Sequence, residues 1–159
     1  MNQRFIAACL LAAWVGWMPA AALAADTPDV KVADDKLAPA RAHIKAKQWA
    51  AAIDELKRVN DAGSADWNNL MGYSHRKAPA ADLATAERFY DEALRIDPRH
   101  RGALEYSGEL YLMQGRLERA EQRLAALDKA CFLPCEEFTD LRKAVERYKA
   151  NGNRYVAKE

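Results

Sequence analysis

The sequence has few of the residues from which most catalytic and metal sites are built. It holds three histidines and three cysteines among 159 residues. His43, His75 and His100 do not lie at ligand spacing from one another, and no strand is present for a glycine-rich phosphate loop to follow. Neighbours such as Glu87 and Arg88 are typical of a solvated helix face. We therefore predict that the chain is not an enzyme and that it binds no cofactor and no metal.

The chain also lacks an excess of charge of either sign. Its 24 lysines and arginines balance 23 aspartates and glutamates, for a formal net charge of +1. Nucleic-acid binding leaves a basic patch as its footprint, and attachment to an anionic membrane requires a cluster of basic residues. The composition therefore argues against both as partners.

Residues 1–24 have the three-part layout of a secretory signal peptide. Arg4 supplies the positive start, an apolar run extends to Met18, and small residues precede a cleavage site after Ala24. The apolar run covers about 14 residues, whereas a membrane-spanning helix needs about 20. We predict cleavage after Ala24, no membrane insertion after that cleavage, and a periplasmic location.

The remaining chain divides into a leader, one domain and a tail. Residues 25–37 mix charge with proline and have no helical period, which predicts a flexible leader. Residues 38–149 are rich in Ala, Leu, Arg, Glu and Lys, carry apolar residues at helical spacing, and place Gly and Pro at the joints. This pattern predicts one all-α domain with a single core. Residues 150–159 are predicted to be a disordered tail.

A helical pattern recurs on both sides of Pro98. It consists of small and large residues at steps of three and four: Ala86, Tyr90 and Ala93 before the proline, and Leu104, Gly108 and Tyr111 after it. Small residues let two helices approach closely, and large neighbours fill the gap beside them. Pro98 ends a helix because it has no N–H for the helical hydrogen bond, and Gly115 permits a tight turn. The pattern predicts successive helical hairpins.

These residues resemble the tetratricopeptide repeat (TPR) family over about residues 38–130. The resemblance implies an α-solenoid of about three TPR-like hairpins, at 38–61, 66–97 and 101–129. A further helix over 135–149 carries one apolar stripe and is predicted to cap the stack. The Cys-x3-Cys-Glu-Glu element that starts at Cys131 also resembles small exported bacterial TPR proteins. The resemblance implies a binding role and no assigned activity.

The first helices of such hairpins line a concave groove, and the residues that face it recur at steps of three and four. The predicted partner-binding residues are Asn69, Tyr73, Arg76 and Lys77 in the second hairpin, and Glu105, Glu109 and Leu112 in the third. Tyr73 and Leu112 are predicted to anchor an extended peptide that carries both charge signs. The alternative is that these are ordinary solvent-facing residues. Trp49 and Trp67 are predicted to pack in the core.

Cys131 and Cys135 lie between the third hairpin and the last helix. In an oxidising compartment such a pair predicts a disulfide that fixes the angle of the capping helix. Two alternatives remain open at this point, a redox-responsive thiol pair and a metal site. Redox enzymes favour Cys-x2-Cys on a βαβ unit, and a structural metal needs about four ligands.

The sequence thus predicts a periplasmic scaffold that binds a protein or peptide partner in its groove. An alternative is a structural or oligomerisation subunit of an envelope complex, including a homo-oligomer. The short predicted first helix motivates this alternative, because we expect it to leave Trp49 and Ile53 partly uncovered. A third hypothesis is a redox-responsive factor that works through Cys131 and Cys135.

Overall fold

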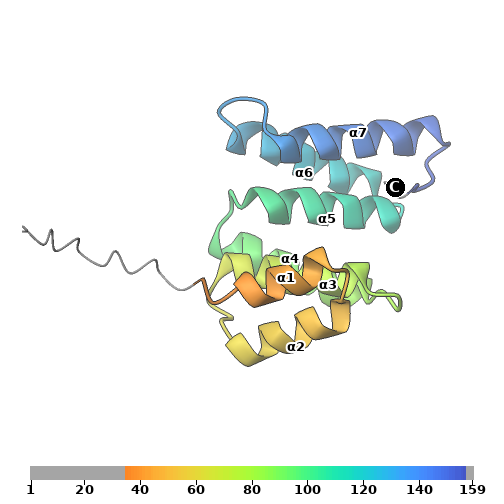
Figure 1. The fold of residues 1–159 in the computed structure, drawn as a ribbon. Helices are drawn as coiled ribbons and strands as arrows, with labels where there is room; N and C mark the ends of the chain where they lie inside the picture. Colours follow the sequence, from red (N-terminus) through yellow and green to blue (C-terminus); the bar gives the residue numbers. More distant parts are fainter. Residues whose placement is uncertain (1–34, 157–159) are drawn as a thin grey trace, which may run out of the picture. The chain divides into compact units, whose positions relative to one another are not determined.

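The computed structural model describes residues 35–156, so the predicted signal peptide and most of the leader lie outside the described residues. Residues 35–156 form an all-α stack of antiparallel helix pairs (Figure 1). The helices are α1 (Ala38–Lys45), α2 (Trp49–Val59), α3 (Ala65–Lys77), α4 (Leu83–Ile96), α5 (Arg101–Met113), α6 (Leu117–Ala130) and α7 (Glu136–Ala150). The pairs are α1 with α2, α3 with α4, and α5 with α6, and α7 packs on α5 and α6. The predicted fold class is confirmed.

The helix boundaries follow local sequence signals. Pro39 lies in the first turn of α1, where its missing N–H removes no helical hydrogen bond. Ser64 and Asp82 begin α3 and α4 by accepting hydrogen bonds from backbone N–H groups of the first turn. Gly115 has a φ of +75°, so it makes the predicted tight turn between α5 and α6. Leu37 was assigned to the leader but is buried at the start of α1.

The core consists of two clusters of buried side chains. The smaller one joins α1, α2 and α3 through residues that include Leu37, Leu56 and Trp67. The larger one joins α4, α5, α6 and α7 and is built around residues such as Tyr90 and Leu141. Trp67 is 6% exposed, and its indole N–H donates to the Leu56 carbonyl oxygen at 2.7 Å. Its predicted core position is confirmed.

Two glycines allow the closest helix approaches. A β-carbon at Gly72 would lie 2.8 Å from ring carbons of Tyr90 and 3.1 Å from the Ala86 carbonyl oxygen. A β-carbon at Gly108 would lie 2.5 Å from the side chain of Leu141 on α7. Side chains essentially never approach this closely in a packed interior. Gly72 therefore sets the distance between α3 and α4, and Gly108 sets the distance between α5 and α7.

We expect Gly72→Ala to lower the free energy of unfolding by about 1–2 kcal/mol, because crowding a buried ring costs more than the helix gains from alanine. Urea unfolding followed by circular dichroism measures the change. Gly63→Ala is the control, since a β-carbon there meets nothing within 4 Å. Equal stability of the two variants would show that the approach of α3 to α4 does not depend on Gly72.

Candidate functional site

The helices α3 and α5 are the first helices of the second and third hairpins, and each has a narrow strip of partly or fully exposed residues along one face. The strips are Asp66, Leu70, Tyr73 and Lys77 in α3, and Gly102, Tyr106, Glu109 and Met113 in α5. Both advance by four, three and four residues, which is the spacing of one helix face. Most other residues of these helices are buried, because α3 packs on α2, α4 and α5, while α5 packs on α4, α6 and α7.

The two strips meet in a pocket of about 250 Å³, which we call the tyrosine pocket. It is lined by Tyr73, Arg76 and Lys77 of α3, Glu105, Tyr106 and Glu109 of α5, Asp140 of α7, and Tyr155 of the C-terminal segment. The ring centroids of Tyr73 and Tyr106 lie 4.6 Å apart, and Trp49 packs edge-on against Tyr73 at 6.0 Å. Aromatic rings at these distances attract one another beyond the effect of burial. They form a preformed aromatic wall.

Arg76 lies behind this wall as a buried cation. Its side chain is 2% exposed, and its guanidinium donates to Glu109 Oε2 at 2.8 Å. It also stacks over the rings of Tyr73 and Tyr106, at 5.5 and 5.6 Å from their centroids. Burial opposes its charge, but the Tyr90 hydroxyl and the Glu109 carboxylate hold the pKa of Arg76 above its ordinary value. Arg76 is thus paired inside the protein and supports the pocket from within.

Glu105 lies in the same pocket and is only 8% exposed. Burial raises the pKa of Glu105 from 4.5 to about 8, and the nearby carboxylates of Glu109, Asp140 and Glu137 add to the shift. A carboxyl group with this pKa is protonated at neutral pH. The pocket therefore presents one neutral carboxylic acid beside the charged carboxylate that pairs with Arg76.

This proton makes stability depend on pH. Between pH 4.5 and about 8 the folded protein holds a proton on Glu105 that the unfolded chain releases. Stability therefore falls as pH rises through this window. We expect the wild-type protein to lose about 1–3 kcal/mol of unfolding free energy between pH 5 and 8 relative to Glu105→Gln. Urea titrations at several pH values measure it.

The control for this pH profile is Glu118→Gln, on an exposed position of α6. It should keep the wild-type profile, because the side chain at this position is not buried. Profiles for wild type and Glu105→Gln that run parallel across the window would contradict the raised pKa.

The structure brings five of the seven predicted groove residues into the tyrosine pocket and leaves two outside it. Leu112 is 1% exposed in the larger core cluster, so its prediction as an exposed anchor is wrong. Asn69 is 7% exposed, and its side-chain amide lies against the start of α5 near Gly102. Both errors have one cause. Asn69 and Leu112 each lie one residue before a position of the strips that reach solvent, Leu70 and Met113.

Tyr106 and Tyr155 are pocket residues that the sequence reasoning did not assign. Tyr106 follows Glu105 directly. It belongs to the exposed strip of α5 and lines the pocket, whereas the sequence-based prediction named Glu105. The signal was available, because the equivalent strip of α3 contains another tyrosine, Tyr73. Tyr155 comes from the segment predicted to be disordered, and no periodicity marks it.

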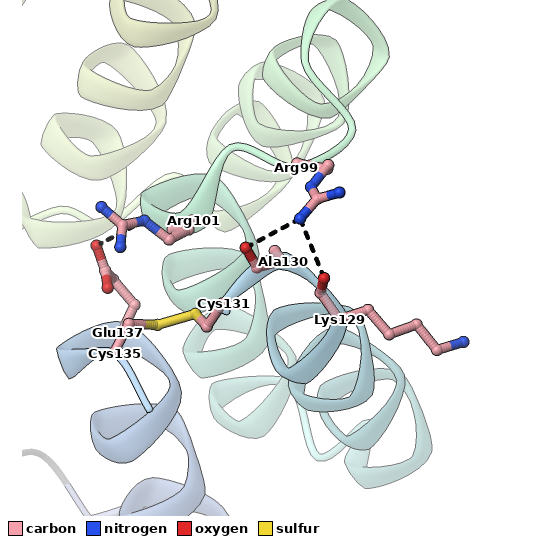
Figure 2. Close-up of a disulfide and its surroundings, with 7 residues drawn as sticks. All are labelled: Arg99, Arg101, Lys129, Ala130, Cys131, Cys135 and Glu137. Atoms are coloured by element: carbon pink, nitrogen blue, oxygen red, sulfur yellow. Dashed lines mark hydrogen bonds and ion pairs between the residues drawn. A yellow bond between two sulfur atoms is a disulfide. The ribbon is translucent and has the colours of Figure 1, made fainter. Parts of the chain in front are cut away.

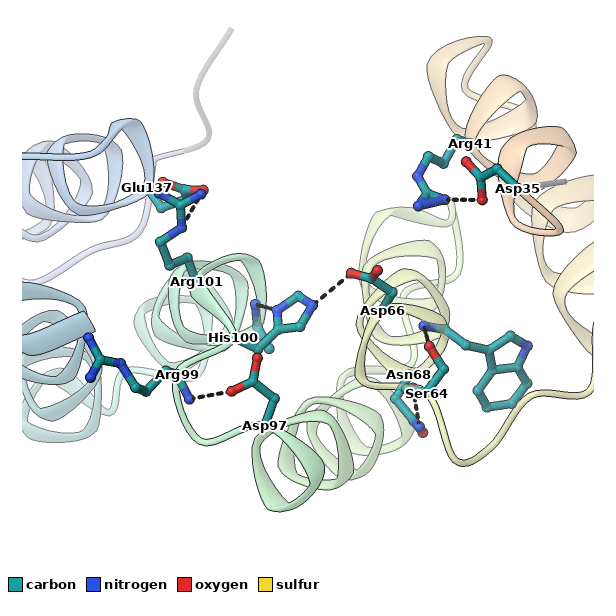
Figure 3. Close-up of polar contacts among 12 residues, drawn as sticks. Asp35, Arg41, Ser64, Asp66, Asn68, Asp97, Arg99, His100, Arg101 and Glu137 are labelled. Atoms are coloured by element: carbon teal, nitrogen blue, oxygen red, sulfur yellow. Dashed lines mark hydrogen bonds and ion pairs between the residues drawn. The ribbon is translucent and has the colours of Figure 1, made fainter. Parts of the chain in front are cut away.

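The starts of α3, α5 and α7 lie together at one edge of the stack (Figure 3). Most of the side chains at this edge are polar or charged. The ring of His100 caps α5, since its Nδ1 accepts from the Ala103 N–H at 3.0 Å. The proton of the neutral ring is then on Nε2, which lies 3.0 Å from a carboxylate oxygen of Asp66 on α3. Arg101 pairs with Glu137 on α7 at 3.5 Å. These contacts link successive first helices.

Cys131 and Cys135 form a disulfide with an S–S distance of 2.03 Å and a Cα–Cα distance of 5.9 Å. The bond joins the end of α6 to the start of α7 (Figure 2). Beside it, Arg99 donates to the carbonyl oxygens of Lys129 and Ala130, which end α6, at 3.2 Å each. Helix ends leave such carbonyls without a partner within the helix. The disulfide and Arg99 together define the end of α6.

The loop that the disulfide closes is very short, so its effect on the unfolded chain is small. We expect reduction to lower the free energy of unfolding by no more than about 2 kcal/mol and to leave the helical circular-dichroism spectrum unchanged. Urea unfolding with and without a reductant tests this, with the Cys131→Ser, Cys135→Ser double variant as the control that reductant should not affect. Loss of helical signal on reduction would contradict this prediction and show that the helices depend on the disulfide.

Within residues 35–156, no helix is long and apolar enough to cross a membrane. The same residues contain no group of three or more His, Cys, Asp or Glu side chains placed to hold a metal ion. The residues that line the tyrosine pocket carry aromatic rings with hydroxyls, a lysine, an arginine and carboxyl groups.

Comparison with known proteins identifies one repeat. Residues 80–130 match the tetratricopeptide repeat family. This stretch runs from the loop before α4 to the end of α6. No curated protein matches the chain. The match confirms the TPR resemblance over residues 80–130, and TPR domains generally mediate protein–protein binding.

Proposed function

We propose that this chain, which carries a tetratricopeptide repeat at residues 80–130, is a periplasmic scaffold that binds a protein or peptide in its tyrosine pocket. The observation that carries the proposal is the pocket itself. Two tyrosine rings from successive first helices form a preformed wall, and a buried ion pair holds them in place. The periplasmic location rests on the signal-peptide layout of residues 1–24.

Binding would use the groups that reach solvent. An apolar or aromatic side chain of the partner packs against Tyr73 and Tyr106, and Lys77 and the exposed part of Glu109 give polar contacts at the rim. A wall held in place before binding loses little conformational entropy when the partner docks. Aromatic anchors in central pockets commonly supply most of the energy of such interfaces. The proposed role needs no catalytic group.

The test is capture of a partner from a periplasmic extract by chemical crosslinking. The bait variant carries Tyr73→Ala and Lys77→Ala, which change the pocket without breaking the buried pair of Arg76 and Glu109. We expect this variant to lose at least about tenfold of the captured partner, as expected when an aromatic contact worth about 1.4 kcal/mol or more is removed. The control is Arg88→Ala, on an exposed position of α4.

All baits must give the same circular-dichroism spectrum, so that loss of capture reports on the surface and not on folding. Equal capture by wild type and by the pocket variant would remove the tyrosine pocket as the working surface.

A structural or oligomerisation role is the second candidate, and a separate observation favours it. An apolar depression of about 760 Å³ lies beside α2, and Trp49, Ile53 and Pro79 are among the residues that line it. Trp49 and Ile53 are partly exposed, in line with the short first helix. Exposed apolar surface of this kind often meets another protein surface. In the capture experiment, a chain with this role would recover further copies of itself or the subunits of a larger complex, equally with wild type and with the pocket variant.

A further inference from the structure

The C-terminal segment returns to the tyrosine pocket after α7 ends. Gly152 and Asn153 both have positive φ, +66° and +59°, and reverse the chain toward α5 (Figure 1). Their N–H groups donate to the carbonyl oxygens of Lys149 and Tyr148, at 3.1 and 3.0 Å. Glycine and asparagine are the residues that most readily adopt this left-handed conformation. The reversal is therefore encoded in the sequence Asn151-Gly152-Asn153.

This reversal of the chain places Tyr155 at the tyrosine pocket. Its ring lines the tyrosine pocket and packs against the larger core cluster, although its neighbours Arg154 and Val156 are exposed. Burial raises the pKa of the Tyr155 hydroxyl, and Glu109 and Arg76 are among the charged groups that act on it. A single aromatic side chain thus enters the pocket from a segment that is otherwise at the surface. This is the arrangement of a docked peptide with one anchor residue.

We propose that residues 152–156 are an internal ligand of the tyrosine pocket, and that the pocket's partner is a peptide whose aromatic side chain replaces Tyr155. The inference rests on the proposed function, and it names the chemistry of the partner. The tail competes with the partner for the same space. Because it is tethered, its effective concentration is in the millimolar range for a short linker. A free partner displaces the tail only if its affinity and concentration outweigh the high local concentration of Tyr155. The tail therefore sets the lowest affinity at which a partner binds.

The test uses a fluorescent synthetic peptide with the sequence of residues 150–159 and the full chain as receptor. We expect Tyr155→Ala to bind this peptide at least about tenfold more tightly than wild type, because the variant leaves the pocket open for a larger fraction of the time. A second peptide with alanine in place of its tyrosine should not bind. Val156→Ala is the matched control protein, and it should behave as wild type does.

Trypsin gives an independent readout at the bond after Arg154. We expect faster cleavage there in Tyr155→Ala than in wild type or in Val156→Ala, with unchanged circular dichroism. Equal peptide affinity of Tyr155→Ala and wild type, no binding to either, or equal cleavage of both would overturn the proposal.

These outcomes are separable from the test of the scaffold. Peptide binding by Tyr155→Ala together with equal partner capture by the Tyr73 and Lys77 variant would keep the tail as the pocket's occupant and reject the scaffold's binding surface. If the partner is captured by wild type but not by the pocket variant, and the peptide does not bind, the tyrosine pocket stays the scaffold's binding surface and the tail is rejected as its internal ligand.

Discussion

The ion pair of Arg76 with Glu109 joins α3 to α5, and the tyrosine pocket depends on it. A guanidinium that is 2% exposed is costly to bury unless its charge is matched. Glu109 supplies the matching charge at 2.8 Å, and the rings of Tyr73 and Tyr106 lie side by side next to the group, with their centroids 5.5 and 5.6 Å from it. The cation therefore fixes two rings from two different helices.

The same pair explains the charge state of the pocket. Glu109 is committed to Arg76, and Glu105 lies close by in a site with little water. A second carboxylate charge there would face both burial and repulsion, so Glu105 keeps its proton to about pH 8. The pocket is thus less acidic than its sequence suggests. This favours an aromatic occupant such as Tyr155 over a strongly basic one.

The helical hairpins were predictable from sequence because their signals are local. Pro98 and Gly115 act through their own backbone, and Ala86 and Gly108 allow close helix approach wherever they occur. The register of the exposed strips was not predictable to one residue. Leu112 is fully buried and Tyr106 only partly buried because α4, α6 and α7 all cover α5, and a helix period alone does not say which neighbours will be present. Tyr155 lies outside any period.

The sequence by itself determined the all-α fold, the order of the hairpins, and the residue types that surround the site. Helix propensity, capping and the spacing of small residues act within one segment or between adjacent segments. These signals can therefore be recognised in the sequence alone. Only the tertiary structure decided that Arg76 faces Glu109, that Glu105 is protonated, and that Tyr155 lines the pocket. These depend on burial and on contacts between residues far apart in the chain. A charge or a ring acquires such properties only when other helices exclude water from around it.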